Sequence, residues 1–506
     1  MLSPNLLGSP VLTAPNLLPV MRELPADLET PVSVYLKLAG GGPSFLLESV
    51  TGGEQLARYS FIGVDSRQAY VLRGDLLAHH DPSGARVTEL AAGFDPLDLL
   101  REEMARYSPT PLPGLPRFAG GLVGYLGYET ARHFEPTLGL SAPADLPDAI
   151  LLLAETVVAF DHAFGRLLLI TNVSLEEGES AARAAGEVRL DDLQRRLAGP
   201  IPTPAALTRR ANVNPSPTRP LRSNMSREEY CAAVLQAKEH IAAGDIFQVV
   251  LSQRFSRQTS AAPFAIYRAL RRLNPSPYMF FFDFAGLAGA PSAYLIGASP
   301  ELHVRLQPAA GGSRQAIIRP IAGTRVRGVD AAADASLEQE LLADPKERAE
   351  HVMLVDLARN DLGRVCEYGT IHVPELMGVE RYSHVMHIAS QVEGTLRPEQ
   401  DAFDLMRATF PAGTVSGAPK IRAMQIIRDL EPGPRGPYAG AVGYFSYDGS
   451  LDTCITIRTL VMRGDTVSVQ AGAGIVADSD PEREYQETVN KAQALATAVQ
   501  RAEEQS

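Results

Sequence analysis

Two stretches of the sequence place carboxylates where they could share a divalent cation. In KERAEHVMLVDLARNDLGR, Glu347 and Glu350 are three residues apart, and in PEREYQETVNKAQAL, Glu484, Glu487 and Lys491 follow at helical spacing. Side chains three or four residues apart share one face of a helix. Mg²⁺ prefers one or two carboxylates completed by water and substrate oxygens. Either stretch could equally be a solvated helix face stabilised by ion pairs, so both interpretations stay open at this point.

The stretch 410–427, FPAGTVSGAPKIRAMQII, predicts a loop of small residues that leads into a helix. Prolines and glycines crowd its first half, and Ile421, Met424 and Ile427 recur at helical spacing. Free N–H groups and the helix dipole at such a junction attract anions. A tight loop before any helix looks similar, and a nucleotide-binding P-loop is excluded because Lys420 follows proline and precedes isoleucine.

Three further positions are polar or small in apolar surroundings. Gln248 lies in the middle of the apolar strand IFQVVLSQR, and Arg458 lies in the expected strand CITIRTL. A buried arginine needs an acid, and a substrate carboxylate would serve as well as one from the protein. Gly472-Ala473-Gly474 follows the expected strand TVSVQ and would allow a ligand to approach the backbone closely. His387, in HVMHIAS, is more typical of a satisfied core histidine. Together these features predict a magnesium-dependent pocket for a small, multiply anionic molecule that carries carboxylates.

Composition limits the remaining possibilities. With 506 residues, the chain is longer than a single core usually grows, so two lobes are expected. It has 47 basic and 59 acidic residues, which argues against a nucleic-acid surface. Its three cysteines are far apart and favour a reducing, cytoplasmic location. The first residues do not resemble a signal peptide, and no stretch is apolar for long enough to cross a membrane.

The order of expected elements supports this division. Short strands are expected over 31–73, including SVYLKL, SFLLESV and YSFIGV, and strands at 149–160 and 165–172 are expected to form a hairpin. A helix near 176–197 precedes a proline-rich linker at 199–223. The second half begins with a helix capped by Ser226 and Glu229 and is rich in strands. Helices are expected at 335–362, 401–408, 418–430 and from Pro481 to about Glu503.

Many short motifs of the sequence are similar to the motifs of a known family. In the second half they are FQVVLSQR, NPSPYMF, GASPE, RPIAGTR, ERAEHVMLVDLARNDLGRV, YSHVMHI, GTVSGAPK, PYAGAVGY, TIRT, QAGAGIV and EYQET. This half resembles the chorismate-binding enzymes. With SFLLESV and RYSFIG, residues 30–500 resemble the anthranilate synthase component I branch of that family.

The resemblance implies an α+β fold, a large two-lobe α/β sandwich of mostly antiparallel sheets with helices on the outer faces. It implies a regulatory, tryptophan-binding lobe at 1–198, a linker at 199–223 and a chorismate-binding catalytic lobe at 224–506. It also implies an activity, the conversion of chorismate and ammonia to anthranilate and pyruvate with Mg²⁺. The ammonia would come from glutamine through a separate amidotransferase subunit, because no cysteine lies in a Gly-x-Cys-x-Gly setting.

Site residues are implied by the matching motifs. Glu350 and Glu487 would hold the magnesium. The catalytic residues would be His387, Thr414, Gln248 and, as general acid for the departing hydroxyl, Glu301. The substrate site would be lined by Gly323, Thr324, Tyr438, Arg458, Gly472, Ala473, Gly474 and Lys491.

Two positions separate related activities within the family. Isochorismate and salicylate synthases carry a lysine base where this chain has Gln248, and aminodeoxychorismate synthases carry a nucleophilic lysine where this chain has Ala322. Both positions therefore indicate amination next to the ring carboxylate. The alternatives are aminodeoxychorismate synthase component I and a non-enzymatic tryptophan sensor. Val326 departs from the family's usual proline, with little consequence.

The resemblance further implies feedback inhibition of the first committed step of tryptophan biosynthesis. The LLES and NPSPYM motifs would form an allosteric tryptophan pocket between the lobes. Its residues would be Glu48, Ser49, Asn274, Pro275, Pro277, Tyr278 and Met279. Such a pocket regulates only if tryptophan binds two states of the protein with different affinity.

Overall fold

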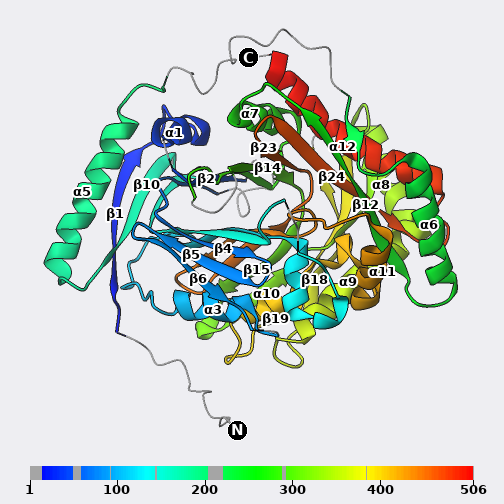
Figure 1. Ribbon diagram of the computed structural model, residues 1–506, viewed down its shortest axis with the longest axis horizontal. Coiled ribbons are helices and arrows are strands. Elements are labelled where there is room, and N and C mark those ends of the chain that lie inside the picture. Colours follow the sequence, from blue (N-terminus) through cyan, green and yellow to red (C-terminus); the bar gives the residue numbers. More distant parts are fainter. Residues whose placement is uncertain are drawn as a thin grey trace.

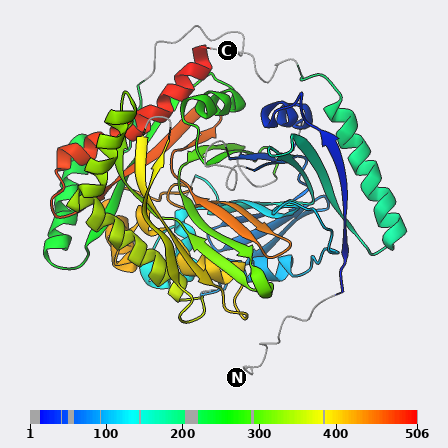
Figure 2. The same ribbon diagram turned by 180° about the vertical axis from the view of Figure 1, so that it is seen from behind.

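The computed structural model consists of two large antiparallel sheets with helices on their outer faces (Figures 1 and 2). It describes residues 14–40, 42–49, 58–91, 93–142, 145–202, 220–287, 292–382 and 385–504. The predicted α+β class, with two stacked antiparallel sheets, is confirmed. No helix within these ranges is long and apolar enough to cross a membrane.

The first sheet has a long N-terminal strand at one edge and, at the other edge, a short strand from the start of the C-terminal half. Its order is β1 (Leu17–Pro25), β10 (Arg166–Ser174), β9 (Thr156–Asp161), β3 (Tyr59–Gly63), β2 (Ser44–Glu48), β13 (Tyr278–Asp283), β14 (Ala293–Ser299), β23 (Thr459–Arg463), β24 (Thr466–Ile475), β12 (Gln248–Gln258) and β11 (Arg222–Ser223), and β20 (Gly417–Ala418) also pairs with β12.

The second sheet has its C-terminal strands at one end and its N-terminal strands at the other. Its order is β17 (Ile321–Val326), β19 (Val385–Thr395), β16 (Arg314–Ile318), β15 (Leu302–Pro308), β22 (Leu451–Ile455), β21 (Ala441–Ser446), β7 (Gly121–Leu126), β8 (Ala149–Ala154), β4 (Gln68–Arg73), β5 (Leu76–Asp81) and β6 (Gly84–Glu89), and β18 (His372–Arg381) pairs with β19.

Helices cover both sheets on the outside. On the first sheet these are α1 (Pro31–Leu38), α5 (Glu179–Leu197), α7 (Pro263–Leu273) and α12 (Pro481–Glu504), with α6 (Arg227–Ala242) and α11 (Lys420–Leu430) against β12. On the second these are α3 (Pro96–Met104), α9 (Pro345–Gly363) and α10 (Ala402–Thr409), with α8 (Ala331–Ala343) against β17 and the short α4 (Ala131–Phe134) after β7. In Figure 1, α5 and α6 lie at opposite sides of the molecule.

The central strands explain the long apolar runs in the sequence. In β13, Phe280 and Phe282 point into the core between the sheets, whereas Met279 and Phe281 point into the core under the outer helices. Successive side chains of a strand face opposite sides, so a strand covered on both faces must be apolar at nearly every position. The YMFFFD run is therefore a strand buried on both faces.

Both sheets are continuous through the two halves of the chain. In the first sheet β2 pairs with β13, and in the second β7 pairs with β21. Each pairing joins a strand from before residue 198 to a strand from after residue 223. The domain division at 198 and 223 stays a prediction, and most of the linker, 203–219, lies outside the described residues.

The expected strand SVYLKL is wrong, because residues 31–38 form the helix α1. Thr30 and Ser33 form a capping box, Pro31 occupies the first turn, and Val34 and Leu38 are buried one turn apart. The β-branched residues suggested a strand, but the start signal and the helical spacing of the buried residues decide the structure.

Two other expected elements are divided. The stretch 149–160 is two strands, because the chain leaves the second sheet after β8 and enters the first at β9, with Glu155 between them. The stretch 335–362 is two helices, α8 and α9, separated at Asp344, whose side chain caps α9. The hairpin formed by β9 and β10, the capping box at Ser226 and the last helix from Pro481 are confirmed.

Candidate functional site

A half-buried carboxylate and a buried amide from different elements meet at the centre of the candidate site. Gln248, on β12, donates a hydrogen bond from Nε2 to Oε1 of Glu350, on α9, at 3.1 Å. Burial raises the pKa of Glu350, the amide of Gln248 opposes this, and the negative charges of Glu347 and Glu487 add to the rise. An acid that repels its neighbours in this way is stabilised by a cation.

The acids of α12 lie close enough to those of α9 to affect them. Glu487 Oε1 lies 2.6 Å from Nζ of Lys491, which also donates a hydrogen bond to the carbonyl of Gly472 at 2.9 Å. Burial and the charge of Glu487 raise the pKa of Glu484. The helical spacing that predicted a shared face on α12 therefore corresponds to a real stripe of charge.

These residues fit a hard divalent cation whose remaining ligands would be water and oxygens of the substrate. Among the described residues no three histidine, cysteine, aspartate or glutamate side chains form a ready-made metal site. Glu350 on α9 and Glu487 on α12 provide two carboxylates close enough to affect each other, and Mg²⁺ commonly takes one or two with water and substrate oxygens for the rest. The donor chemistry fits magnesium, and the two residues are those predicted for it.

The small residues of the predicted backbone wall lie within β24 rather than after it, which corrects the expected end of that strand. Gly472, Ala473 and Gly474 pair with β12 opposite Ser252, Leu251 and Val250. They continue the strand because β12 supplies a full ladder of hydrogen-bond partners.

Any side chain at the two glycines would collide with site residues. A Cβ on Gly474 would lie 2.5 Å from Nε2 of Gln248, and one on Gly472 would lie 2.6 Å from the Tyr438 hydroxyl oxygen. Since real Cβ atoms do not approach so closely, the predicted need for small residues here has a steric basis.

Arg458 lies between β22 and β23, not within a strand as expected. Its φ of 51° places it in the left-handed region, which a continuous strand would not allow. Burial lowers the pKa of its guanidinium, and the charges of Glu487 and Tyr438 oppose this. No carboxylate within the described ranges forms an ion pair with it, so it remains available to a carboxylate of the substrate.

The predicted histidine contacts two other predicted residues. Nδ1 of His387, on β19, lies 3.0 Å from the Thr324 hydroxyl and 3.0 Å from the Gly323 carbonyl, both on β17. A carbonyl only accepts, so the hydrogen bond to Gly323 places the proton on Nδ1. Burial lowers the pKa of His387, and the nearby charge of Arg458 contributes. The imidazole is therefore neutral at physiological pH.

The predicted general acid is held in its protonated form. Glu301 is 6% exposed, and burial raises its pKa to about 8, with Thr414 and the backbone of Ile321 opposing the rise. The buried Thr414 hydroxyl makes no hydrogen bond of normal geometry with any described residue. A carboxyl that keeps its proton at neutral pH can donate it to a leaving group.

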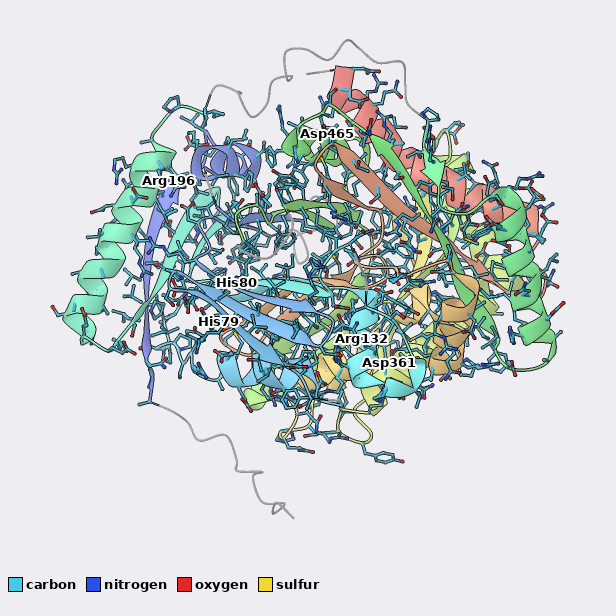
Figure 3. The ribbon with its side chains drawn as sticks, in the orientation of Figure 1. His79, His80, Arg132, Arg196, Asp361 and Asp465 are labelled. Carbon is cyan, nitrogen blue, oxygen red and sulfur yellow. The ribbon has the colours of Figure 1, made fainter. Side chains whose placement is uncertain are left out.

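The loop at 410–418 supports the site from one side. It contains a short 3₁₀ turn at Gly413–Val415, and β20 pairs Ala418 with Gln248. Lys420, at the start of α11, binds Asp361 (labelled in Figure 3) at 2.8 Å and also donates to the Thr409 carbonyl at 3.2 Å. Both partners of the Lys420 ammonium are therefore groups of the protein itself, which indicates a structural role.

An open depression on α12 includes residues that were not predicted from the family motifs. Arg458, Glu487 and Lys491 line it together with Arg483 and Asn490. Arg483, Glu487 and Asn490 share one face because they recur at intervals of three and four residues. The helical spacing used for Glu487 and Lys491 could therefore have found both.

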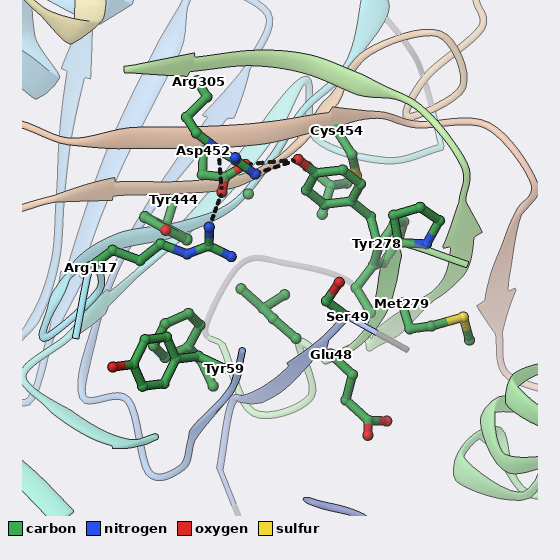
Figure 4. Close-up of a pocket in the computed structure, with 16 residues that line it drawn as sticks. Glu48, Ser49, Tyr59, Arg117, Tyr278, Met279, Arg305, Tyr444, Asp452 and Cys454 are labelled. Carbon is green, nitrogen blue, oxygen red and sulfur yellow. Dashed lines mark hydrogen bonds and ion pairs between the residues drawn. The ribbon is translucent and has the colours of Figure 1, made fainter. Parts of the chain in front are cut away.

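A second, more enclosed pocket contains most of the predicted allosteric residues (Figure 4). It encloses about 510 Å³ and is lined by Glu48, Ser49, Pro277, Tyr278 and Met279, on or directly after β2 and on or just before β13. The Ser49 hydroxyl is buried and has no hydrogen-bond partner among the described residues. Asn274 and Pro275 belong to the same NPSPYM segment but do not line this pocket.

The polar wall of this pocket was not predicted from the sequence. Asp452 accepts hydrogen bonds from the Tyr278 hydroxyl at 3.1 Å and from Nε of Arg305 at 3.0 Å, and Nη1 of Arg117 lies 3.5 Å away (Figure 4). On the opposite side, the Glu48 carboxylate bonds to Arg271 at 3.0 Å and to Tyr267. The sequence offered little signal for it, because Arg305 and Asp452 lie in strands that also contain other polar residues.

Comparisons with known proteins agree with this geometry. The family model described as chorismate binding enzyme matches residues 57–497. Anthranilate synthase component 1 of Pseudomonas aeruginosa is 47% identical over 493 residues, covering 97% of this chain and 96% of the relative. The same component of a Synechocystis strain is 46% identical over 498 residues, covering 96% of each.

Solved structures show the same fold. The crystal structure of anthranilate synthase component I from Streptococcus pneumoniae matches with a TM-score of 0.74 at 36% identity, covering 94% of this chain and 99% of that one. The menaquinone-specific isochorismate synthase of Escherichia coli matches with a TM-score of 0.71 at 21% identity, covering 96% and 95%, and shows the fold alone. The chain belongs to the chorismate-binding enzyme family, in the branch of the anthranilate synthase component 1 proteins.

Proposed function

We propose that this chain is the large subunit of an anthranilate synthase, a lyase that forms anthranilate and pyruvate from chorismate and ammonia. One observation carries the proposal: Gln248, an amide that cannot act as a base, donates to the half-buried Glu350 at the centre of the site. Members of the family that activate water carry a lysine at this position. Ammonia needs no such base because it is already a nucleophile.

Magnesium is part of this proposal. When bound by Glu350 and Glu487, it would offset the charge of a substrate carboxylate and draw electrons from the ring. Arg458 is placed to bind a carboxylate, because its guanidinium is largely buried and forms no ion pair within the described ranges. The absence of side chains at Gly472 and Gly474 lets Tyr438 and Gln248 lie directly against the backbone of β24.

One group on the protein accounts for the proton of the leaving hydroxyl. Ammonia forms a bond to the ring carbon next to the one that carries the carboxylate, and the ring hydroxyl leaves as water with the proton of Glu301, which the proton lost from the bound nitrogen can replace. The carbon that took the nitrogen then loses its hydrogen as a proton while the C–O bond to the enolpyruvyl group breaks, and the released enolpyruvate takes up a proton on its CH₂ carbon to become pyruvate. The ring becomes aromatic, which makes this last step favourable.

Two regulatory and assembly features extend the proposal. A separate glutamine amidotransferase, component II, would supply ammonia, since the relatives are named as component 1 of a larger enzyme. Tryptophan would bind the pocket lined by Ser49 and Met279 and lower the affinity for chorismate. Three free thiols, Cys231, Cys366 and Cys454, fit the predicted cytoplasmic location.

The direct test is a fluorescence assay for anthranilate with purified chain, chorismate, an ammonium salt and Mg²⁺. We expect anthranilate and an equal amount of pyruvate, and no product when the metal is removed by a chelator. Isochorismate or 4-amino-4-deoxychorismate as the product would move the chain to another activity of the family. Tight tryptophan binding without any turnover would support the sensor alternative.

A further inference from the structure

We propose that a cavity on the far side of Tyr438 is a binding site for a small carboxylate, and that its ligand is the pyruvate released by the reaction. This inference rests on the proposed function for the identity of the ligand. The cavity encloses about 500 Å³, and Arg254 on β12, Arg463 on β23, Ser468 and Gln470 on β24 and Asp145 line it.

The charges of the cavity call for an anion. Arg254 is half-buried, and no acid within the described ranges pairs with its guanidinium. Among the described residues, Arg463 pairs with Asp145 alone, whose carboxylate is 3.5 Å away and 66% exposed. The buried Arg435 also reaches the cavity, but its ion pair with Glu431 at 2.6 Å balances it. The lining therefore keeps a net positive charge in a chain whose net charge is −12.

The neutral polar groups of the cavity donate within the protein, Ser468 to the Val461 carbonyl and Gln470 to Ser252, so the arginines are left to bind a ligand. Gln470 has used its amide nitrogen in a 2.8 Å hydrogen bond to the Ser252 hydroxyl, which in turn donates to Glu431. This chain fixes the wall of the cavity. Guanidinium groups bind carboxylates through paired N–H donors, whereas ammonium would be repelled. The ligand class expected for this cavity is therefore a small carboxylate and not ammonium.

The cavity borders the chorismate site directly. Tyr438 belongs to its lining and is also the residue whose hydroxyl opposes Gly472 in the candidate site. Thr459, another lining residue, follows Arg458 in the chain. Arg458, Glu487 and Lys491 line the open depression on α12, and Tyr438 does not. A carboxylate leaving the site past Tyr438 would thus meet Arg254 and Arg463.

The test measures pyruvate binding by ¹³C NMR line broadening, in protein without chorismate. We expect pyruvate to bind the wild-type chain and to bind at least tenfold more weakly to Arg254→Gln and to Arg463→Gln. Arg222→Gln, which removes an exposed arginine on the adjacent strand β11, is the matched control and should stay within about twofold. Circular dichroism of each variant shows whether weaker pyruvate binding comes from a change in the cavity or from misfolding. If one arginine variant misfolds, the other still tests the inference.

Arg458→Gln distinguishes this cavity from the chorismate site. Because Arg458 lines the substrate side, pyruvate binding should remain within about twofold in this variant, although turnover of chorismate is lost. Loss of pyruvate binding in Arg458→Gln, unchanged binding in both cavity variants, or no binding to the wild-type chain overturns the inference. The anthranilate assay on the same wild-type preparation tests the proposed function separately, since the binding measurement needs no turnover.

Discussion

The catalytic site and the enclosed pocket of Figure 4 are built from similar residues in opposite states of electrostatic balance. In the enclosed pocket, Asp452 is 5% exposed and is neutralised by Arg305 and Arg117. In the candidate catalytic site, Glu350 is half-buried near other acids and Arg458 has no acid partner within the described ranges. The acid of the enclosed pocket therefore finds its partners within the protein. The candidate site leaves its charges unpaired, as expected if the proposed cation and an anionic substrate bind there.

This difference indicates which charged groups of the protein still lack a partner and could gain one from a ligand. Burying a charge without a partner costs several kcal/mol, so a protein retains such groups only where something else provides the partner. The same reasoning distinguishes Lys420, which Asp361 neutralises, from Arg458. The predictions below test the contrast between the two regions, from the largest effect to the smallest.

Removing the acid at the centre of the site should have the largest effect. Glu350→Gln should reduce kcat/KM by at least about a thousandfold, or about 4 kcal/mol in transition-state stabilisation, because a carboxylate proposed to hold magnesium is lost. Anthranilate fluorescence at saturating Mg²⁺ measures this. Glu350→Asp, which keeps the charge, is the control and should recover part of the activity at higher Mg²⁺. Full magnesium-dependent turnover in Glu350→Gln would remove this residue from the metal site.

Breaking the balanced network should affect stability. Asp452→Asn should lower the free energy of unfolding by about 3 kcal/mol, because it leaves Arg305 buried without its acid. Glu487→Gln should lower it by less than about 1 kcal/mol, since Glu487 and Lys491 are 49% and 34% exposed. Urea unfolding followed by circular dichroism compares the two variants. Equal losses of stability would contradict the contrast between the regions.

The general acid should control the alkaline limb of the pH profile. Glu301 must carry its proton to donate it, and its raised pKa of about 8 keeps it protonated at neutral pH. Activity should therefore be present below pH 8 and fall as the pH rises through about 8. Glu301→Gln should lose about a hundredfold in kcat and lose this limb. A wild-type profile that is flat to pH 9.5, with chorismate and free ammonia held constant, would disprove the assignment.

Filling the enclosed pocket should remove regulation without removing catalysis. Ser49→Phe places a ring in the space beside Met279, so the tryptophan concentration for half-inhibition should rise at least tenfold, about 1.4 kcal/mol. The kcat should stay within about twofold because the catalytic residues are not touched. Ser33→Ala, in the exposed capping box of α1, is a control that should leave inhibition unchanged. Inhibition of Ser49→Phe at the wild-type tryptophan concentration would refute the tryptophan site.

Much of the fold could be predicted from local signals. Start signals such as the Ser226 capping box and apolar runs such as YMFFFD identified the right elements, because they depend on neighbouring residues. The error at 31–38 arose where the β-branched residues and the cap of the same segment disagreed. The split of 149–160 at Glu155 could not be predicted, since periodicity does not reveal that one apolar run crosses between two sheets.

The candidate site was predictable to the extent that its residues carry charge in unusual places. The helical spacing of Glu487 and Lys491 and the apolar setting of Arg458 were both visible. Asp452, Arg305 and Arg117 were not, because their partners are far apart in the chain and each alone resembles an ordinary surface charge.

The sequence by itself determined the residue types, their local spacing and, through its motifs, the family. Those properties depend on residues that are close together in the chain and on motifs shared with the family. Only the tertiary structure decided which charges are neutralised. Asp361 neutralises Lys420 while Arg458 has no acid partner in the described part of the chain, and Asp452 is balanced while Glu350 is not. Charge balance in a protein interior depends on distances of a few ångströms between residues remote in sequence, and only the packing of the two sheets sets those distances.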